Sequence, residues 1–162
     1  MRVVCPGSFD PVTNGHLDIF TRAAHDWEHV TVLVTYNPNK NGLFSAEERV
    51  ELIERALGGL PEDRRPTNIT VDTWDRLLVD YFREHQIGAI VKGLRTSLDY
   101  EYELPMAQMN QHLSGVDTYF LLTDPKYGYV SSTLCKEVAK YGGDVTGLLP
   151  DAVVEAVAAK FG

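Results

Sequence analysis

Short apolar runs with the character of β-strands alternate along the chain with segments in which apolar residues recur every three or four positions. The five strand-like runs are Val3–Cys5, Val30–Tyr36, Ile69–Asp72, Ala89–Val91 and Thr118–Leu122. A helix between two strands carries the chain back to the end of the sheet where the first strand began, so the two strands pair in parallel. The sequence therefore predicts an α/β fold with a doubly wound, parallel five-stranded sheet.

Helical spacing of apolar residues predicts the segments that connect and follow these strands. They cover Leu17–Trp27, Val50–Leu60, Leu77–Phe82, Leu98–Leu113 and Val153–Phe161. The sequence SAEE at Ser45–Glu48 has the form of a capping box and predicts a helix start. Pro105 interrupts the fourth helical segment, because proline lacks a backbone N–H and clashes with the carbonyl group of Glu101. We therefore expect a kink or a break near Glu101–Pro105.

Length and composition are typical of a single globular domain over residues 1–162. The chain is 44% hydrophobic and 23% charged, and no shift in composition marks a domain boundary. No apolar run approaches the ~20 residues of a membrane-spanning helix, and the N-terminus lacks the apolar stretch of a secretory signal. Cys5 and Cys135 have no metal-ligand spacing and are too few for a disulfide framework, so we expect buried free thiols. These features predict a cytoplasmic protein.

The formal net charge of −8 at pH 7 argues against a general binder of nucleic acids or of anionic membranes. We expect neither class of partner. A small molecule that carries phosphate is still compatible with this charge. Its site then has to be a local cluster of positive groups within an acidic protein.

The stretch Pro6–His16, PGSFDPVTNGH, follows the first predicted strand, at the end of the sheet where ligands bind in doubly wound folds. An Asn-Gly pair between two strands indicates a hairpin, but here a helical pattern follows, so Asn14–Gly15 leads into a helix N-terminus. The free N–H groups of such an end attract anions, and Ser8 and His16 add polar side chains. The residues alone leave two interpretations open, a phosphate site and a structural turn.

Within this loop, GSFDPVTNGH resembles the G-x-F-D-P-x-[TH]-x-G-H signature of the nucleotidyltransferase superfamily. Further stretches, in the same order along the chain, resemble one family within it, the bacterial phosphopantetheine adenylyltransferases. They are NPNK at Asn37–Lys40, FSAEERVELI at Phe44–Ile53, KGLR at Lys92–Arg95, DYEYELPMAQMN at Asp99–Asn110 and YVSSTLCKEVAKYGGDV at Tyr129–Val145. Thr13 stands where many relatives outside this family carry histidine. The resemblance implies a Rossmann-like nucleotidyltransferase fold.

The same resemblance implies an enzyme of coenzyme A biosynthesis. Such an adenylyltransferase moves AMP from ATP to 4′-phosphopantetheine and releases dephospho-coenzyme A and pyrophosphate, in the penultimate step of the pathway. The acceptor phosphate attacks the α-phosphorus of ATP directly, without a covalent enzyme intermediate. Positioning and charge stabilisation carry this kind of reaction, and the sequence accordingly shows no Ser-His-Asp set and no activated cysteine motif.

Three residues are implied by the resemblance as catalytic. His16 and Arg95 are expected at the ATP phosphates, where His16 stabilises the transition state, and Lys40 is expected at the acceptor phosphate. Without the resemblance, His16 is a helix-cap histidine and Lys40 an ordinary surface lysine. The residues implied in acceptor binding are Ser8, Lys40, Leu78 and Lys92. Core packing explains Leu78 nearly as well.

ATP binding is implied for a larger set from three parts of the chain. The set is Ser8, Phe9, His16, Gly93, Leu94, Arg95, Glu103, Tyr127, Gly128, Tyr129, Val130, Ser131, Ser132 and Thr133. Phe9, Gly93 and Leu94 are expected to contribute backbone groups. Two simpler explanations stay open: Glu103 shares a solvated helix face with Glu101, and the hydroxyl groups of residues 131–133 act only as N-caps.

The resemblance further implies Mg²⁺ carried with ATP, a homohexamer, and coenzyme A as an inhibitor that competes for the site. We predict no protein metal site, because the five histidines form no metal-ligand motif. The segment Asp99–Asn110 is the candidate for subunit contact.

Two alternative functions fit parts of the pattern. Within the superfamily, a nicotinate mononucleotide adenylyltransferase or a glycerol-phosphate cytidylyltransferase would carry histidine at the position of Thr13 and a C-terminal motif that ends in arginine. At the position of that C-terminal motif, this chain has SSTLCKE. A non-catalytic sensor of nucleotides or coenzyme A would be marked by the loss of His16 or Lys40, and both are present.

Overall fold

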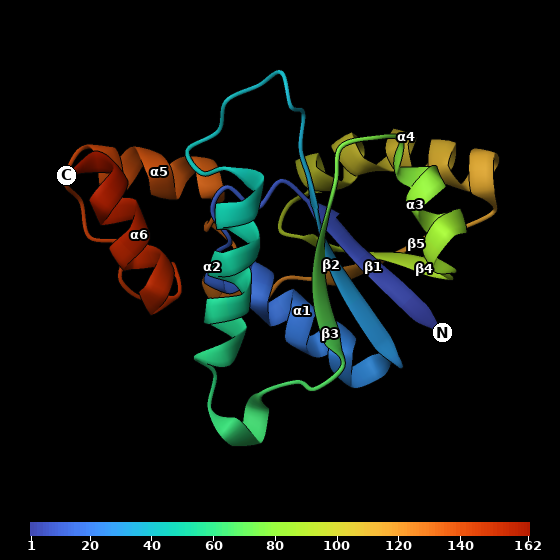
Figure 1. The fold of residues 1–162 in the computed structure, drawn as a ribbon, viewed down its shortest axis with the longest axis horizontal. Coiled ribbons are helices and arrows are strands. Elements are labelled where there is room, and N and C mark those ends of the chain that lie inside the picture. Colours follow the sequence, from blue (N-terminus) through green and yellow to red (C-terminus); the bar gives the residue numbers. More distant parts are fainter.

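Five parallel strands form one sheet in the computed structural model, which describes residues 1–162 (Figure 1). In their spatial order the strands are β3 (Ile69–Trp74), β2 (His29–Thr35), β1 (Arg2–Gly7), β4 (Ala89–Leu94) and β5 (Asp117–Leu122). All pairings are parallel, which confirms the predicted doubly wound α/β fold. Every predicted strand is present, with ends within about three residues of the predicted ones, the usual uncertainty of such boundaries.

The order of the strands reverses between β1 and β4. β1 pairs with β2 along its whole length, from Arg2 to Gly7, but it pairs with β4 only at Val3 and Val4. Beyond these two positions β1 stays bonded to β2 alone and β4 to β5 alone. The sheet therefore splits at the point where ligands bind in folds of this type.

Six helices connect and follow the strands. They are α1 (Asn14–Asp26), α2 (Ala46–Gly58), α3 (Leu78–His85), α4 (Ser97–Ser114), α5 (Ser132–Lys140) and α6 (Asp151–Phe161), with short 3₁₀ turns η1 (Glu62–Arg64) and η2 (Pro125–Tyr127). α6 packs against both α2 and α5, and α3 and α4 pack together away from them (Figure 1). The predicted helical segments are helices, although Trp27, Leu60 and Leu77 lie just outside α1, α2 and α3.

The predicted capping box at the start of α2 is confirmed. Oγ of Ser45 accepts the backbone N–H of Glu48 at 3.1 Å, and Oε1 of Glu48 accepts the N–H of Ser45 at 3.0 Å. The two bonds satisfy N–H groups that a helix start otherwise leaves unpaired. They fix where the loop after β2 ends.

Apolar side chains cover both faces of the sheet, as expected for parallel strands between helices. Val3 and Cys5 belong to a large cluster with α1, α2 and α6, whereas Val4, between them, belongs to a smaller cluster with α3. This alternation follows from the two-residue period of a strand. Cys5 and Cys135 are buried free thiols, as predicted.

Pro105 does not break α4. The helix runs without interruption from Ser97 to Ser114, so the predicted break is wrong, and the predicted kink stays a prediction. Both Glu101 and Pro105 are exposed, so water can satisfy the carbonyl group that proline leaves unpaired. A capping box of Thr96 and Asp99 further stabilises the start of the helix.

The surface of α4 is unusually apolar for a helix without a single buried residue. Its exposed large side chains are Leu98, Tyr100, Tyr102, Met106, Met109 and Leu113. No helix of the protein combines the length and the apolar character that crossing a membrane requires. An exposed apolar patch on a helix of this kind is typical of a surface that contacts another protein.

Candidate active site

A cavity of about 520 Å³ opens where β1 and β4 separate. Its walls are the loop after β1, the first turns of α1, the end of β4, one side of α4 and the start of α5. Among the residues predicted for the site, it brings together Ser8, Phe9, His16, Lys92, Gly93, Arg95, Glu103, Val130, Ser131, Ser132 and Thr133. Segments up to about 125 residues apart in the sequence thus meet at one point.

The loop after β1 leads into a helix, as predicted, and not into a hairpin. Thr13 is the N-cap of α1, and its Oγ1 accepts the backbone N–H of His16 at 3.3 Å. The first turn of α1, with Gly15 and His16, lines the cavity. The positive end of the helix dipole is therefore available to an anion in the cavity.

The ring of His16 is held by the same cap. The backbone N–H of Thr13 donates to Nδ1 of His16 at 3.0 Å, so Nδ1 carries no proton. In a neutral imidazole the proton then has to sit on Nε2. The histidine offers this second nitrogen as a hydrogen-bond donor.

His16 is neutral at pH 7. Burial first, and then the positive charges of Arg95 and Lys92, lower the pKa of its ring from 6.5 to about 4. The sequence did not settle the protonation state of this residue. The structure gives an uncharged N–H donor among cations.

Phe9 positions His16 with its ring. The residue has a φ of 46°, and its buried ring meets His16 edge-on with 5.0 Å between the ring centroids. Gly7 makes room for this ring, because a Cβ atom there would lie 2.7 Å from Cζ of Phe9. The sequence predicted a backbone contact from Phe9, and the structure adds this packing role for its side chain.

Each cation in the cavity has a carboxylate partner. Nζ of Lys92 lies 3.0 Å from Oε1 of Glu103, and Nη2 of Arg95 lies 3.5 Å from Oδ1 of Asp99. Glu103 lines the cavity and is not a solvated residue like Glu101, so that simpler explanation is wrong. Within each pair, the carboxylate balances the positive charge of the cation.

At the start of α5, two of the three predicted hydroxyl groups already have structural partners. Oγ of Ser131 accepts the N–H of Leu134 at 3.1 Å as the N-cap, and Oγ of Ser132 donates to the carbonyl oxygen of Pro11 at 2.7 Å. The N-cap explanation thus holds for Ser131. All three residues, with Thr133, still line the cavity with the free N–H groups of the helix start.

The sequence matches a family model described as cytidylyltransferase-like over residues 4–138. Curated relatives cover nearly the whole chain. A phosphopantetheine adenylyltransferase of Corynebacterium efficiens is 70% identical over 99% of this chain and 98% of its own, and one of Corynebacterium diphtheriae is 61% identical over 98% and 97%. The chain belongs to the phosphopantetheine adenylyltransferase family.

Solved structures of other adenylyltransferases share the fold of this family member. A nicotinic acid mononucleotide adenylyltransferase of Plasmodium falciparum superposes with a TM-score of 0.71 at 12% identity, over 98% of this chain and 94% of that one. A bifunctional NMN adenylyltransferase/ADP ribose pyrophosphatase of Francisella tularensis gives 0.69 at 14% identity, over 98% and 48%. At such identities the likeness concerns the fold alone.

Six residues that the resemblance to phosphopantetheine adenylyltransferases placed in the site do not line the cavity. They are Lys40, Leu78, Leu94, Tyr127, Gly128 and Tyr129. Lys40 is exposed and lines a second hollow of about 720 Å³, which shares Ser8, Ser132 and Thr133 with the cavity. Leu78 packs against the apolar cluster of α3, in line with the core-packing alternative.

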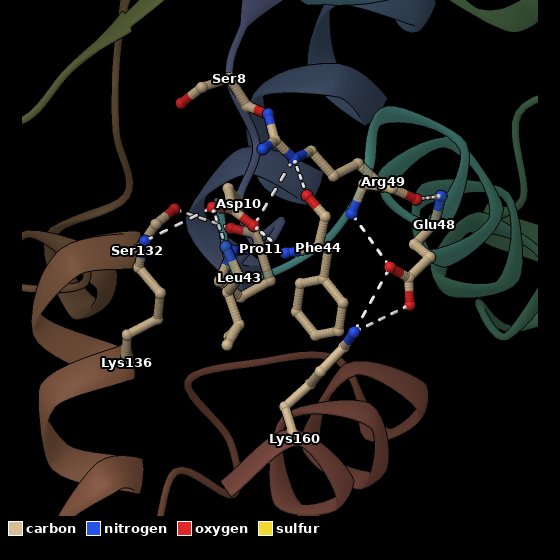
Figure 2. Close-up of polar contacts among 11 residues, drawn as sticks. Ser8, Asp10, Pro11, Leu43, Phe44, Glu48, Arg49, Ser132, Lys136 and Lys160 are labelled. Carbon is tan, nitrogen blue, oxygen red and sulfur yellow. Dashed lines mark hydrogen bonds and ion pairs between the residues drawn. The ribbon is translucent and has the colours of Figure 1, made fainter. Parts of the chain in front are cut away.

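The adenylyltransferase fold also brings in charged residues that sequence reasoning missed. Asp99 lines the cavity beside Arg95, and the Thr96–Asp99 capping pattern could have indicated it. Asp10 and Arg49 are both buried, and they meet between the loops that follow β1 and β2 (Figure 2). Two charged residues separated by 39 positions in the sequence leave no local signal of this contact.

Proposed function

We propose that this protein transfers AMP from ATP to 4′-phosphopantetheine, which gives dephospho-coenzyme A and pyrophosphate in the penultimate step of coenzyme A biosynthesis. One observation carries the proposal. The cavity at the β1–β4 split gathers His16, Lys92 and Arg95 with two helix N-termini, and it adjoins the hollow of Lys40. Two phosphate-bearing substrates can meet at this junction.

In this mechanism the protein positions the substrates and stabilises charge. An oxygen of the acceptor phosphate forms a bond to the α-phosphorus of ATP, and the bond from that phosphorus to the bridging oxygen of pyrophosphate breaks. No enzyme nucleophile takes part. Burial raises the pKa of the Cys5 thiol to about 12, which leaves no thiolate at neutral pH.

The Nε2–H group of His16 donates a hydrogen bond to a phosphate oxygen of ATP. A neutral donor that already has its orientation needs no reorganisation when negative charge grows in the transition state. The fixed tautomer, the packing by Phe9 and the helix N-terminus support this role. His16 then acts without taking or giving up a proton.

Lys92 and Arg95 bind the substrate phosphates by exchanging their carboxylate partners for phosphate oxygens. Phosphate oxygens compete with Glu103 and Asp99 for the two cations, which the carboxylates keep in place until substrate arrives. Arg95 offers a fork of N–H groups to the ATP phosphates, whereas Lys92 is a point charge for the acceptor. Lys40 approaches the acceptor from the second hollow.

We propose that Mg²⁺ enters as part of the substrate, MgATP. The protein gathers no group of three or more His, Cys, Asp or Glu side chains around a common point. The carboxylates of Asp99 and Glu103 are engaged with cations. Phosphate oxygens and water molecules are the usual ligands of Mg²⁺ in such sites.

We also propose a homohexamer and inhibition by coenzyme A. The exposed apolar side chains of α4, which include Tyr102, Met106 and Met109, support contact between subunits there. Coenzyme A contains the pantetheine and adenylate parts of the two substrates and so would compete with both. Sedimentation and inhibition kinetics test the two proposals separately, and the cytoplasmic location stays a prediction.

The decisive experiment for the function is incubation with MgATP and 4′-phosphopantetheine. We expect release of pyrophosphate and a product with the mass of dephospho-coenzyme A. Nicotinate mononucleotide and glycerol phosphate, each with ATP and with CTP, serve as alternative substrate pairs. Preference for one of these pairs would overturn the proposed function, and so would ATP binding without any turnover.

A further inference from the structure

Asp10 lies outside the cavity wall described above, yet it connects the two loops on which the proposed reaction depends. We propose that Asp10 is a positioning residue, which holds the loop of Lys40 (residues 37–44, between β2 and α2) at the acceptor side of the site. This inference rests on the proposed function, since it assigns Asp10 an effect on the acceptor, 4′-phosphopantetheine. Figure 2 shows the contacts.

The carboxylate of Asp10 binds the end of the Lys40 loop through two backbone groups. Oδ2 accepts the N–H of Leu43 at 2.8 Å, and Oδ1 accepts the N–H of Phe44 at 2.9 Å (Figure 2). Asp10 is only 7% exposed. Hydrogen bonds to a buried carboxylate are strong, because water cannot replace them.

Two cations keep this carboxylate in place. Nε of Arg49 lies 3.5 Å from Oδ1, and Nζ of Lys136, on α5, lies 3.6 Å from Oδ2. Arg49 also donates to the carbonyl oxygens of Phe44 at 3.0 Å and of Ser8 at 3.3 Å. Asp10 and Arg49 together therefore join the Lys40 loop to the loop that carries Ser8.

Gly42 shows independently how closely the Lys40 loop approaches this pair. A Cβ atom at Gly42 would overlap the carboxylate of Asp10 and the guanidinium of Arg49. Only a residue without a side chain lets the backbone pass here. The distance between the two loops is thus set by direct contact.

The rest of the Lys40 loop has few polar anchors of its own. The N–H of Lys40 donates to the carbonyl oxygen of Asn37 at 3.0 Å, and the N–H of Asn39 donates to Oδ1 of Asn37 at 2.9 Å, both within the loop. All hydrogen bonds that leave residues 37–44 go to Asp10 or Arg49, and beyond them Nζ of Lys160 lies 5.5 Å from the centre of the Phe44 ring. Where Lys40 stands relative to Ser8 consequently depends on Asp10.

The test is steady-state kinetics of Asp10→Asn with each substrate varied in turn. The amide keeps the size of the side chain but loses its charge and turns an NH₂ group toward a backbone N–H. We expect the KM for 4′-phosphopantetheine to rise by about tenfold, the effect of losing one such bond. The KM for ATP should change by less than about twofold, because the polar contacts of the Asp10 carboxylate go to Leu43, Phe44, Arg49 and Lys136 and to none of the predicted ATP-binding residues.

A double-mutant cycle separates positioning from general damage. If Asp10 acts through Lys40, then Asp10→Asn combined with Lys40→Ala has the same KM for 4′-phosphopantetheine as Lys40→Ala alone. Independent, additive effects would overturn the proposal. An equal rise of both KM values would also overturn it, because that result indicates a purely structural role.

Two further variants keep the test decisive. Gly42→Ala perturbs the same contact from the loop side and should raise the same KM, which decides the matter if Asp10→Asn does not fold. Asp26→Asn, the same chemical change at an exposed aspartate whose Oδ1 lies 3.0 Å from Nδ1 of His25, is the matched control and should leave both KM values unchanged. Calorimetry compares the affinity of these variants and the wild type for 4′-phosphopantetheine without turnover. The proposed function itself is tested only by the turnover of the wild type.

Discussion

The backbone N–H of Thr13 donates to Nδ1 of His16 across 3.0 Å, and this bond decides which ring nitrogen of the histidine is free to meet a ligand. A protonated Nδ1 would face the N–H group of Thr13 with a second hydrogen. The bond thus disfavours both the other tautomer and the charged imidazolium. Burial and the neighbouring cations act in the same direction on the pKa.

Replacing His16 with alanine should lower kcat by about 10²–10³-fold, the usual effect of removing one preorganised donor from a charge-stabilising site. The KM for ATP should change much less. Initial rates of pyrophosphate release measure both. His25→Ala, at the exposed end of α1, is the control, and a His16→Ala enzyme with wild-type kcat would show that the assignment is wrong.

The lowered pKa of His16 makes the stability of the protein depend on pH. Between about pH 6.5 and pH 4 the unfolded chain binds a proton at this residue that the folded chain does not. The free energy of unfolding should therefore fall as the pH is lowered through this window, by at most about 3 kcal/mol from His16. Urea unfolding at both ends of the window measures the change. The loss should be smaller in His16→Gln, and equal losses would contradict the prediction.

Thr13→Val should reduce both stability and turnover. It removes the N-cap of α1, which costs about 1 kcal/mol in the free energy of unfolding. It also removes the hydroxyl oxygen that lies 3.2 Å from Nδ1 of His16, so the ring keeps only the backbone N–H group as its partner there. Thr13→Ser keeps the hydroxyl group and should behave like the wild type. Nitrogen-15 NMR of the histidine rings reads out the tautomer directly, and a proton on Nδ1 of His16 in the wild type would refute the assignment.

Breaking the pair of Lys92 and Glu103 should separate stability from activity. Lys92→Met leaves a half-buried carboxylate without its partner, and we expect a loss of about 1–3 kcal/mol in the free energy of unfolding. Adding Glu103→Gln should restore much of that stability but not the affinity for 4′-phosphopantetheine, because the positive charge is still missing. Unfolding and kinetics of the wild type and the two variants check this, and a double variant with wild-type KM would argue against the role of Lys92.

The sequence predicts the sheet well because its three central strands are largely buried on both faces, which leaves nearly unbroken apolar runs such as the one around Val32. Pro105 is the exception among the helices. Its local cost is small at an exposed position, and the helix continues on both sides. The tendency of proline to break a helix has little effect here, because water can bind the carbonyl group that has lost its N–H partner.

The candidate site is less predictable from the sequence than the fold. His16 and Ser131 lie in motifs, where a helix start next to a strand end has a visible pattern. Asp10 and Arg49 also lie in motif stretches, GSFDPVTNGH and FSAEERVELI, but neither stretch shows that the two side chains meet, since they come together only when folding brings two loops together. The placement of Lys40 in an adjoining hollow follows from that same contact and not from its own neighbours in the sequence.

The early end of the ladder between β1 and β4 has a consequence for how such enzymes diverge. The strand residues that line the cavity lie beyond the last pair of β1 and β4, so exchanging their side chains does not remove any pairing between these two strands. The framework and the lining of the cavity can then evolve almost independently. Solved structures at only 12–14% identity keep this fold, in line with that independence.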